Sequence, residues 1–301
     1  MTYKKYQHVE KLGNTEVEGI LLGMCYVFPK LDGTNAQVFL KEDNTIGFGS
    51  RNRELSLEKD NAGFMENWLG DKKLEEALVV LNEEFGVTRL AGEWLVPHSL
   101  KTYREEAWRK FYIFDCVTDD EKHIPYETYA PILEAFGLDY ISPMRVIKNP
   151  SIENLNKCLE DNQYLIQDGK GSGEGIVIKN YQFINRFGRQ KWAKIVTSEF
   201  KEKHIKTMGA PISKGTDLVE ELIVDEFVTG ALIDKVYSNI LVQEQGWSSK
   251  FIPRLLQTVF YDLVREHSWD MVKKYKKPKI DYKVLNQFTV NKIKEYKNEI
   301  F

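Results

Sequence analysis

The sequence predicts an α+β protein in which an antiparallel-sheet domain is followed by a smaller all-α domain. Three observations predict this order. Residues 1 to about 205 contain short apolar runs between turn-forming residues, typical of strands, with amphipathic helices interspersed. From about residue 212 onwards, apolar residues recur with the period of a helix. The stretch Met208-Gly209-Ala210-Pro211 between them has the composition of a linker, so we expect domains over 1–208 and 212–301.

In the first domain, the apolar run 21–28 predicts a buried strand, and 36–41 with 45–50 predict a hairpin that turns at Glu42-Asp43-Asn44. Apolar residues at helical spacing predict a helix over 72–85, which Gly86 ends. The other expected elements follow in order: a strand over 87–96, a strand over 111–117, short helices over 125–136 and 151–160, and strands over 174–179 and 191–196.

In the second domain, a helix is expected over 217–241, opened by a capping box from Asp217 to Glu220. A second helix is expected over 249–266 with Pro253 in its first turn, and a third from Asp281 to about 298. The apolar side chains expected to form its core are Leu222, Phe227, Leu255, Val259, Leu263, Leu285 and Phe288.

Composition sets the broad class. The 301 residues are 42% apolar and 29% charged, as in a soluble globular protein, and no apolar run reaches the roughly 18 residues of a membrane span. The N-terminus has no apolar signal region, and Cys25, Cys116 and Cys158 fit reduced thiols. We therefore expect a cytoplasmic monomer outside the membrane.

The net charge of −3 argues weakly against nucleic acid, but two regions are locally basic. Residues 179–206 hold eight Lys/Arg and two Glu, and residues 271–301 hold nine Lys and three acids. Each region could form a solvated face or contact a phosphate backbone.

One stretch between two predicted strands stands out, Lys30-Leu31-Asp32-Gly33-Thr34-Asn35. Gly33 allows a tight turn and close approach of a ligand to the backbone. A lysine at the end of a strand can act as a nucleophile once its proton is removed, whereas the alternative is a solvated hairpin.

Charged residues also lie within or at the ends of the predicted buried strands: Lys30, Glu93, Asp115, Glu174, Lys179 and Lys194. Buried charges are costly unless they are paired or used. Three lysines and three carboxylates suit a polyphosphate with a metal ion, and Phe114 could stack on a base. The alternative is internal ion pairing.

The order of these segments resembles the covalent nucleotidyltransferases, namely polynucleotide ligases and mRNA capping enzymes. The series is Lys30-x-Asp-Gly-Thr-Asn, Ser50-Arg51, Gly92-Glu93, Phe114-Asp115, Glu174-Gly-x-Val-x-Lys179 and Lys194-Ile-Val, over residues 24–197. The Gly-Thr-Asn ending is similar to RNA ligases, whereas DNA ligases and capping enzymes usually have arginine at the place of Asn35. Those enzymes also continue into a β-barrel, whereas the helical second domain here resembles that of phage-type nick-sealing RNA ligases.

The resemblance implies a nucleotidyltransferase (adenylyltransferase) domain in which Lys30 attacks the α-phosphate of ATP and holds AMP. Glu93 would bind the ribose, Phe114 would stack on adenine, and Glu174 would bind Mg²⁺ or Mn²⁺. The remaining residues that it assigns to nucleotide or phosphate binding are Asp32, Asn35, Arg51, Asp115, Lys179 and Lys194. Asp115 would orient Arg51 or another cation. The family often has a second lysine where Val196 stands, and Lys191 is the residue that could compensate.

The function implied is an ATP-dependent RNA ligase that joins 3′-OH and 5′-phosphate ends through a lysyl-AMP and an adenylylated RNA, in RNA repair. Alternatives within enzymes are a DNA ligase or an mRNA capping guanylyltransferase. The alternative from another class is a non-catalytic RNA-binding protein on a ligase fold.

Overall fold

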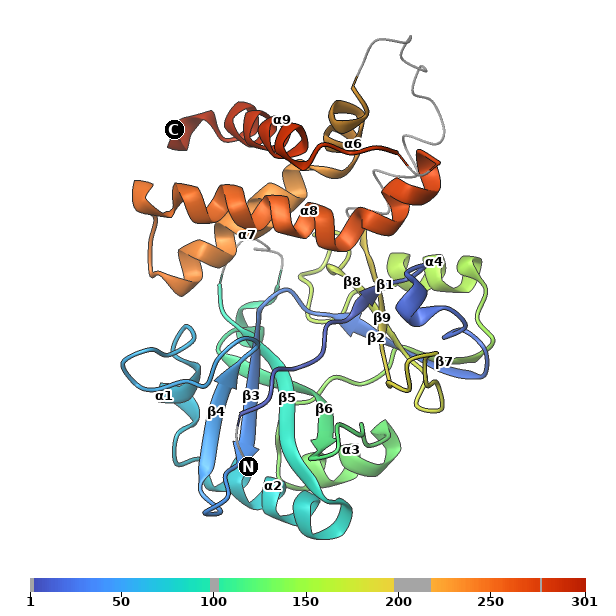
Figure 1. Ribbon diagram of the computed structural model, residues 1–301. Coiled ribbons are helices and arrows are strands. Elements are labelled where there is room, and N and C mark those ends of the chain that lie inside the picture. Colours follow the sequence, from blue (N-terminus) through green and yellow to red (C-terminus); the bar gives the residue numbers. More distant parts are fainter. Residues whose placement is uncertain (1–2, 98–102, 198–217, 277) are drawn as a thin grey trace. The chain divides into compact units, whose positions relative to one another are not determined.

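The computed structural model describes residues 3–97, 103–197, 218–276 and 278–301. The chain divides into two compact units, Met1–Thr197 and Ser198–Phe301 (Figure 1). The linker expected around residues 208–211 lies outside the described residues. Mixed α and β elements in the first unit and helices in the second confirm the predicted α+β class.

The first sheet of the first unit, sheet A, has the strand order β1-β9-β8-β2-β7. Its strands are β1 (Glu10–Lys11), β9 (Ala193–Val196), β8 (Gly175–Lys179), β2 (Met24–Lys30) and β7 (Arg145–Lys148), antiparallel except for the β1–β9 pair.

The register of sheet A places three predicted site lysines on one face. Lys30 lies opposite Gly175 and Tyr26 lies opposite Lys179, while Val177 of β8 lies opposite Lys194. Residues that face each other across a ladder share a face of the sheet, as do alternate residues along a strand. Lys30, Lys179 and Lys194 therefore lie on the same face.

Sheet B is antiparallel with the order β4-β3-β5-β6, from β4 (Ile46–Ser50), β3 (Thr34–Leu40), β5 (Val87–Leu95) and β6 (Lys110–Thr118). The β3–β4 pair confirms the predicted hairpin. The β5–β6 register shifts, because Ala91 pairs with Asp115 but Gly92 pairs with Ile113. Phe114 is thus the extra residue of a β-bulge, a feature that redirects side chains.

Four α-helices in the described part of this unit are α1 (Phe64–Trp68), α2 (Lys72–Phe85), α3 (Tyr126–Ala135) and α4 (Ile152–Glu160). The helix predicted over 72–85 is confirmed. The Asp71 carboxylate accepts a hydrogen bond from the N–H of Leu74, and Gly86 ends the helix with φ of 68°. Helix α2 packs on β5 and α4 packs on β8.

The second unit contains α6 (Val219–Phe227), α7 (Gly230–Gln243), α8 (Ile252–Lys274) and α9 (Tyr282–Tyr296). The single helix predicted over 217–241 is wrong. It breaks at residues 228–229, where the Thr229 side chain accepts from the N–H of Leu232 and starts α7. Of the predicted capping box, Asp217 lies outside the described residues, and the Glu220 carboxylate instead accepts from the N–H of Asp281 at 2.7 Å.

The other two helices of this unit follow the sequence more closely. Helix α8 begins near Pro253 but continues past the predicted end at 266, and Asp281 caps α9 as predicted. Five of the predicted core residues are buried, while Leu222 and Phe288 are half-buried. Short 3-10 helices cover Thr15–Val17, Glu105–Ala107, Ser249–Phe251 and Asn298–Ile300. Within the described ranges, none of the helices has both the length and the apolar character needed to span a membrane.

Candidate active site

Lys30 is the last residue of β2, and its ammonium contacts the carboxylate that precedes β8. The distance from Lys30 Nζ to Glu174 Oε2 is 2.6 Å, and the Glu174 side chain is only 8% exposed. The ladder pair of Lys30 with Gly175 brings the two side chains together. Gly175 is required here, because a Cβ at this position would lie 2.1 Å from the carbonyl oxygen of Ile195. Gly175 allows β8 and β9 to approach closely, and Glu174, the residue before it, supplies the carboxylate that contacts Lys30.

Two hydrogen bonds hold the loop after Lys30, one to Glu93 of sheet B and one to Tyr103 outside that sheet. The N–H of Gly33 donates to Glu93 Oε1, and the N–H of Asp32 donates to the Tyr103 hydroxyl, each at 2.9 Å. Gly33 does not adopt a positive φ. A Cβ there would lie 2.6 Å from the carbonyl oxygen of Trp94, so close packing, rather than the turn expected from the sequence, requires glycine.

Glu93 shares its electrostatic environment with Lys30. Burial raises the pKa of Glu93 to about 7, the positive charge of Lys30 opposes this rise, and the negative charge of Glu174 adds to it. Lys30, Glu174 and Glu93 therefore form one electrically coupled group, in which Glu93 can carry a proton near neutral pH.

A second group of side chains joins the two sheets at Asp115. Asp115 and Lys179 are almost fully buried, and the distance from Asp115 Oδ1 to Lys179 Nζ is 2.9 Å. The other Asp115 oxygen accepts hydrogen bonds from Trp192 Nε1 at 3.1 Å and from the Tyr6 hydroxyl. Burial alone would raise the pKa of Asp115, but Lys179 and His123 outweigh it and hold that pKa below its usual range.

The contacts of Lys179 also fix the bulge in β6. Lys179 Nζ donates to the carbonyl oxygen of Phe114 and lies 4.6 Å from the centroid of the Phe28 ring. The Tyr129 hydroxyl donates to the same carbonyl at 3.2 Å. The cation beside Asp115 is thus Lys179, whereas Arg51 contacts His8.

The Phe114 ring packs against an apolar cluster that includes Leu31, the residue next to Lys30 in the chain. It is half-buried, it lies 5.2 Å from the Tyr6 ring, and it packs against a buried cluster that includes Phe28, Leu31 and Tyr103. Because Phe28 and Leu31 flank Lys30 in the chain, one apolar cluster supports both the lysine and the candidate base-stacking ring.

The remaining predicted residues lie along these two sheets. Asn35 is opposite Glu93 in the β3–β5 ladder. Its side-chain oxygen is buried and accepts no hydrogen bond from the described residues, so a bound ligand could supply the donor. Lys194 pairs with Lys11 in the β1–β9 ladder, and Val196 lies opposite Gly175. Lys191 lies just before β9.

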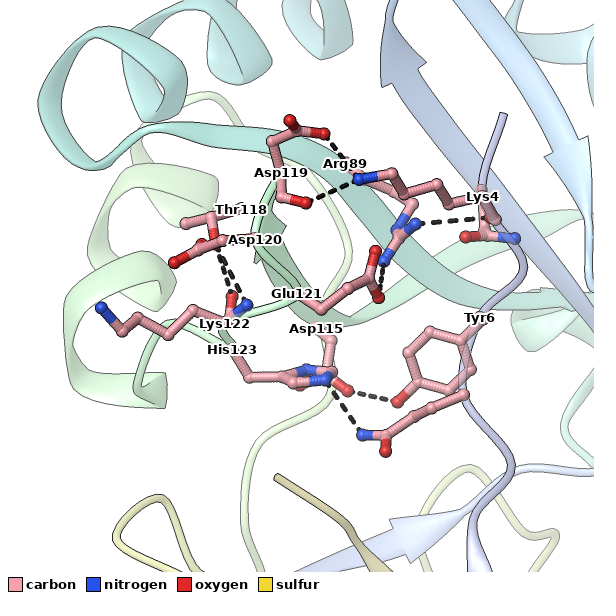
Figure 2. A network of polar contacts seen from close by, with 12 residues as sticks. Lys4, Tyr6, Arg89, Asp115, Thr118, Asp119, Asp120, Glu121, Lys122 and His123 are labelled. Atoms are coloured by element: carbon pink, nitrogen blue, oxygen red, sulfur yellow. Dashed lines mark hydrogen bonds and ion pairs between the residues drawn. The ribbon is translucent and has the colours of Figure 1, made fainter. Parts of the chain in front are cut away.

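Sequence reasoning missed the role of the N-terminal segment. Residues 3–12, here called the N-terminal strap, contact both sheets. The Tyr3 hydroxyl donates to the carbonyl of Ser50 at 2.8 Å, and the N–H of Leu12 donates to the carbonyl of Lys194 at 3.0 Å. Figure 2 shows Lys4 reaching Asp119 and Tyr6 reaching Asp115 from this strap. The sequence signal for this segment is weak: Tyr3 and Tyr6 are the aromatic residues of a mostly polar stretch.

The described carboxylates could hold a divalent cation only if phosphates of a bound substrate supplied further oxygen ligands. Among the described residues, no group of three or more His, Cys, Asp or Glu side chains could hold a metal ion. Mg²⁺ is commonly bound by one or two carboxylates together with substrate phosphates and water. Glu174, beside Lys30, is the carboxylate placed for that arrangement.

The two sheets, with a lysine at the end of one strand and a Glu-Gly pair beside it on the neighbouring strand, form the arrangement expected of the covalent nucleotidyltransferases that the sequence resembles. A family model described as RNA ligase matches residues 24–196, more than half of the chain. The chain therefore belongs to the RNA ligase family. No curated protein matches it.

Solved structures of a Naegleria gruberi RNA ligase share the fold. A mutant with AMP and Mn has 20% sequence identity and a TM-score of 0.50, and the match covers 67% of this chain and 58% of that one. Another mutant, with ATP and Mn, gives the same identity, TM-score and coverage. The chain therefore spans less than two thirds of the length of these structures.

Proposed function

We propose that this protein is an ATP-dependent RNA ligase that joins 3′-OH and 5′-phosphate ends and acts in RNA repair. The observation that carries the proposal is the contact between Lys30 and Glu174, at the point where β2 and β8 start to pair. Membership of the RNA ligase family supports RNA as the substrate, and the Naegleria gruberi complexes with ATP, AMP and Mn support ATP and a divalent cation.

In the first step, Lys30 Nζ loses its proton and attacks the α-phosphorus of ATP. A P–N bond forms, the bond from phosphorus to the bridging oxygen breaks, and pyrophosphate leaves. In the second step, the 5′-phosphate of RNA takes AMP from Lys30, which breaks the P–N bond. In the third, the 3′-OH attacks that 5′-phosphate and AMP leaves. Each step transfers a phosphoryl group, so catalysis depends on positioning and charge stabilisation.

The remaining roles follow from where the side chains lie. Glu93, opposite Asn35, would bind the ribose, and Phe114 would stack on adenine from its bulge. Lys194, which shares a sheet face with Lys30, would contact the α-phosphate together with Lys179. Arg51 would contact nucleotide or RNA phosphates. Glu174 would hold Mg²⁺ or Mn²⁺, whose positive charge offsets that of the phosphates when bound.

The second unit offers a surface suited to RNA on α8. The exposed positions of this helix carry Tyr261, Arg265, Trp269 and Lys273, whereas its acidic residues lie at half-buried positions. Bases stack on aromatic rings, and Arg and Lys contact phosphates. Lys274 is paired with Glu226 at 2.6 Å, and Lys277 of the predicted basic run lies outside the described residues. Because its exposed positions carry aromatic and basic side chains, we include α8 in the RNA-binding surface.

A nick-sealing assay tests the proposal against its alternatives. With ATP, the protein should seal a nick whose 3′-OH end is ribose, and it should tolerate deoxyribose on the 5′-phosphate side, because proteins can read the 2′-OH. Equal sealing of an all-DNA nick would favour a DNA ligase, and labelling by GTP instead of ATP would favour a capping enzyme. RNA binding without a covalent adduct would favour the non-catalytic alternative.

A further inference from the structure

His8 of the N-terminal strap contacts Arg51, the arginine assigned to phosphate binding. The His8 side chain is only 11% exposed, and its Nδ1 lies within hydrogen-bonding distance of an Arg51 Nη2 atom. Arg51 directly follows β4, whose last residue pairs with Ala36, next to Asn35. Arg51 thus lies one residue beyond the end of β4, close to the end of β3 where Asn35 pairs with Glu93.

The chemistry of this contact fixes the state of the imidazole. A guanidinium group can only donate hydrogen bonds, so His8 Nδ1 must accept, and the ring proton of a neutral His8 is then on Nε2. His8 Nε2 lies 3.9 Å from Glu10 Oε2, which also accepts from Asn14 Nδ2 at 3.2 Å. The Glu10 side chain is 14% exposed, so a partly buried carboxylate faces the protonated nitrogen and favours this tautomer.

The strap is anchored on either side of His8, by a side chain on one side and by its backbone on the other. On one side, the Tyr3 hydroxyl bonds the carbonyl of Ser50, immediately before Arg51. On the other, the N–H of Glu10 donates to the carbonyl of Trp192 at 3.0 Å, and β1 pairs with the strand of Lys194. His8 thus lies on a segment fixed to sheet B and to sheet A, which limits how far Arg51 can move.

We propose that His8 is a positioning residue for Arg51: the imidazole, through Nδ1, holds the guanidinium in place for a phosphate of the nucleotide or of the RNA end. This inference rests on the proposed function, because it acts through the phosphate contact assigned to Arg51.

A double-mutant cycle tests it, using ATP-dependent adduct formation and nick sealing by the full chain. His8→Ala should slow the affected step by at least about 10-fold, since misplacement of a group by 1 Å can cost on the order of 100-fold. Arg51→Ala should slow the same step at least as much, and the double variant should be no slower than Arg51→Ala alone. His8→Asn, whose side-chain oxygen can replace Nδ1 as acceptor, should stay within about 3-fold of the wild type.

Two further variants separate positioning from folding. Lys4→Gln changes another residue of the strap and removes its exposed ion pair with Asp119. This variant should leave the rates of adduct formation and nick sealing unchanged. His8→Lys, which places a cation against Arg51, should be as slow as His8→Ala, so a fast His8→Lys variant overturns the inference even if His8→Ala does not fold. Additive losses in the double variant also overturn it. A wild-type protein that forms no AMP adduct would overturn both this inference and the proposed function, whereas normal sealing by His8→Ala overturns this inference alone.

Discussion

Lys30 and Glu174 meet at the first rung of the ladder between β2 and β8, with 2.6 Å between Nζ and Oε2. The contact occupies both side chains in this structure. Under the proposed function, Glu174 would instead hold a divalent cation and Lys30 would contact ATP, so this pair would have to separate before reaction.

Replacing Glu174 should strongly slow metal-dependent adenylylation, because the proposed function assigns the divalent cation to this carboxylate. We expect Glu174→Ala and Glu174→Gln each to lower the rate of AMP transfer by roughly 10²–10³-fold, the usual cost of removing one electrostatic group from a catalytic site. The rate should be measured at saturating ATP and over a range of Mg²⁺ concentrations. A variant that keeps the wild-type rate and Mg²⁺ dependence would show that Glu174 serves only the resting ion pair.

Phe114→Ala should raise the ATP concentration needed for half-maximal adduct formation. Loss of a base–aromatic stack costs about 1–3 kcal/mol, which is roughly one to two decades in affinity. Phe114→Trp keeps an aromatic face at the bulge and should retain most of the affinity. If Phe114→Ala needs no more ATP than the wild type, the ring is a packing residue, as its contact with Tyr6 would also allow.

Asp115→Ala should destabilise the first unit strongly, because it leaves the Lys179 ammonium buried without its carboxylate. Breaking one side of a buried ion pair typically costs about 3–5 kcal/mol of unfolding free energy, whereas replacing both partners by apolar groups costs much less. The double variant Asp115→Ala, Lys179→Met should therefore be more stable than Asp115→Ala alone in urea denaturation. The reverse order of stability would contradict the buried ion pair between Asp115 and Lys179.

Much of the fold could be predicted because its signals are local. The helix over 72–85 has an apolar stripe, an aspartate cap and a terminal glycine, all within its own residues. Short apolar runs likewise placed Lys30 and Glu174 at strand ends. Composition does not show the break at residues 228–229, because the apolar period continues across it and one threonine side chain decides where α7 begins.

Features that depend on residues far apart in the chain could not be predicted. The bulge at Phe114 arises from a change of pairing between β5 and β6, and Lys179, from a third strand, holds its carbonyl. The need for glycine at position 33 comes from the carbonyl of Trp94. The contact of His8 with Arg51 spans 43 positions of the sequence. Neither propensity nor periodicity describes such contacts.

Glu93 should make stability depend on pH in a definite direction. Its pKa is raised from 4.5 to about 7, so between these values the folded protein binds a proton that the unfolded chain has released. Stability from this group should therefore fall as pH rises from about 4.5 to about 7, and change little above that. Glu93→Gln does not titrate at this position, so the wild type should lose stability relative to this variant as pH rises over this range. An equal difference at pH 5 and pH 8 would contradict the shift.

The exposed side of α8 should affect RNA but leave adenylylation intact. Replacing Arg265 and Lys273 by Gln and Trp269 by Ala should weaken RNA binding and flatten its salt dependence, because fewer phosphates are neutralised. The matched control is Lys292→Gln, which removes a lysine paired with Asp225 on another helix of the same unit. Unchanged RNA affinity in the α8 variant would remove this helix from the RNA-binding surface.

The central claim is that Lys30 becomes covalently linked to AMP. Intact mass spectrometry of the full chain, after incubation with ATP and Mg²⁺, tests this most directly. We predict that the wild-type protein gains the mass of one AMP, that the adduct maps to Lys30 after digestion, and that Lys30→Ala gains none. A wild-type protein that stays unmodified, or a Lys30→Ala variant that still gains one AMP, would contradict the account.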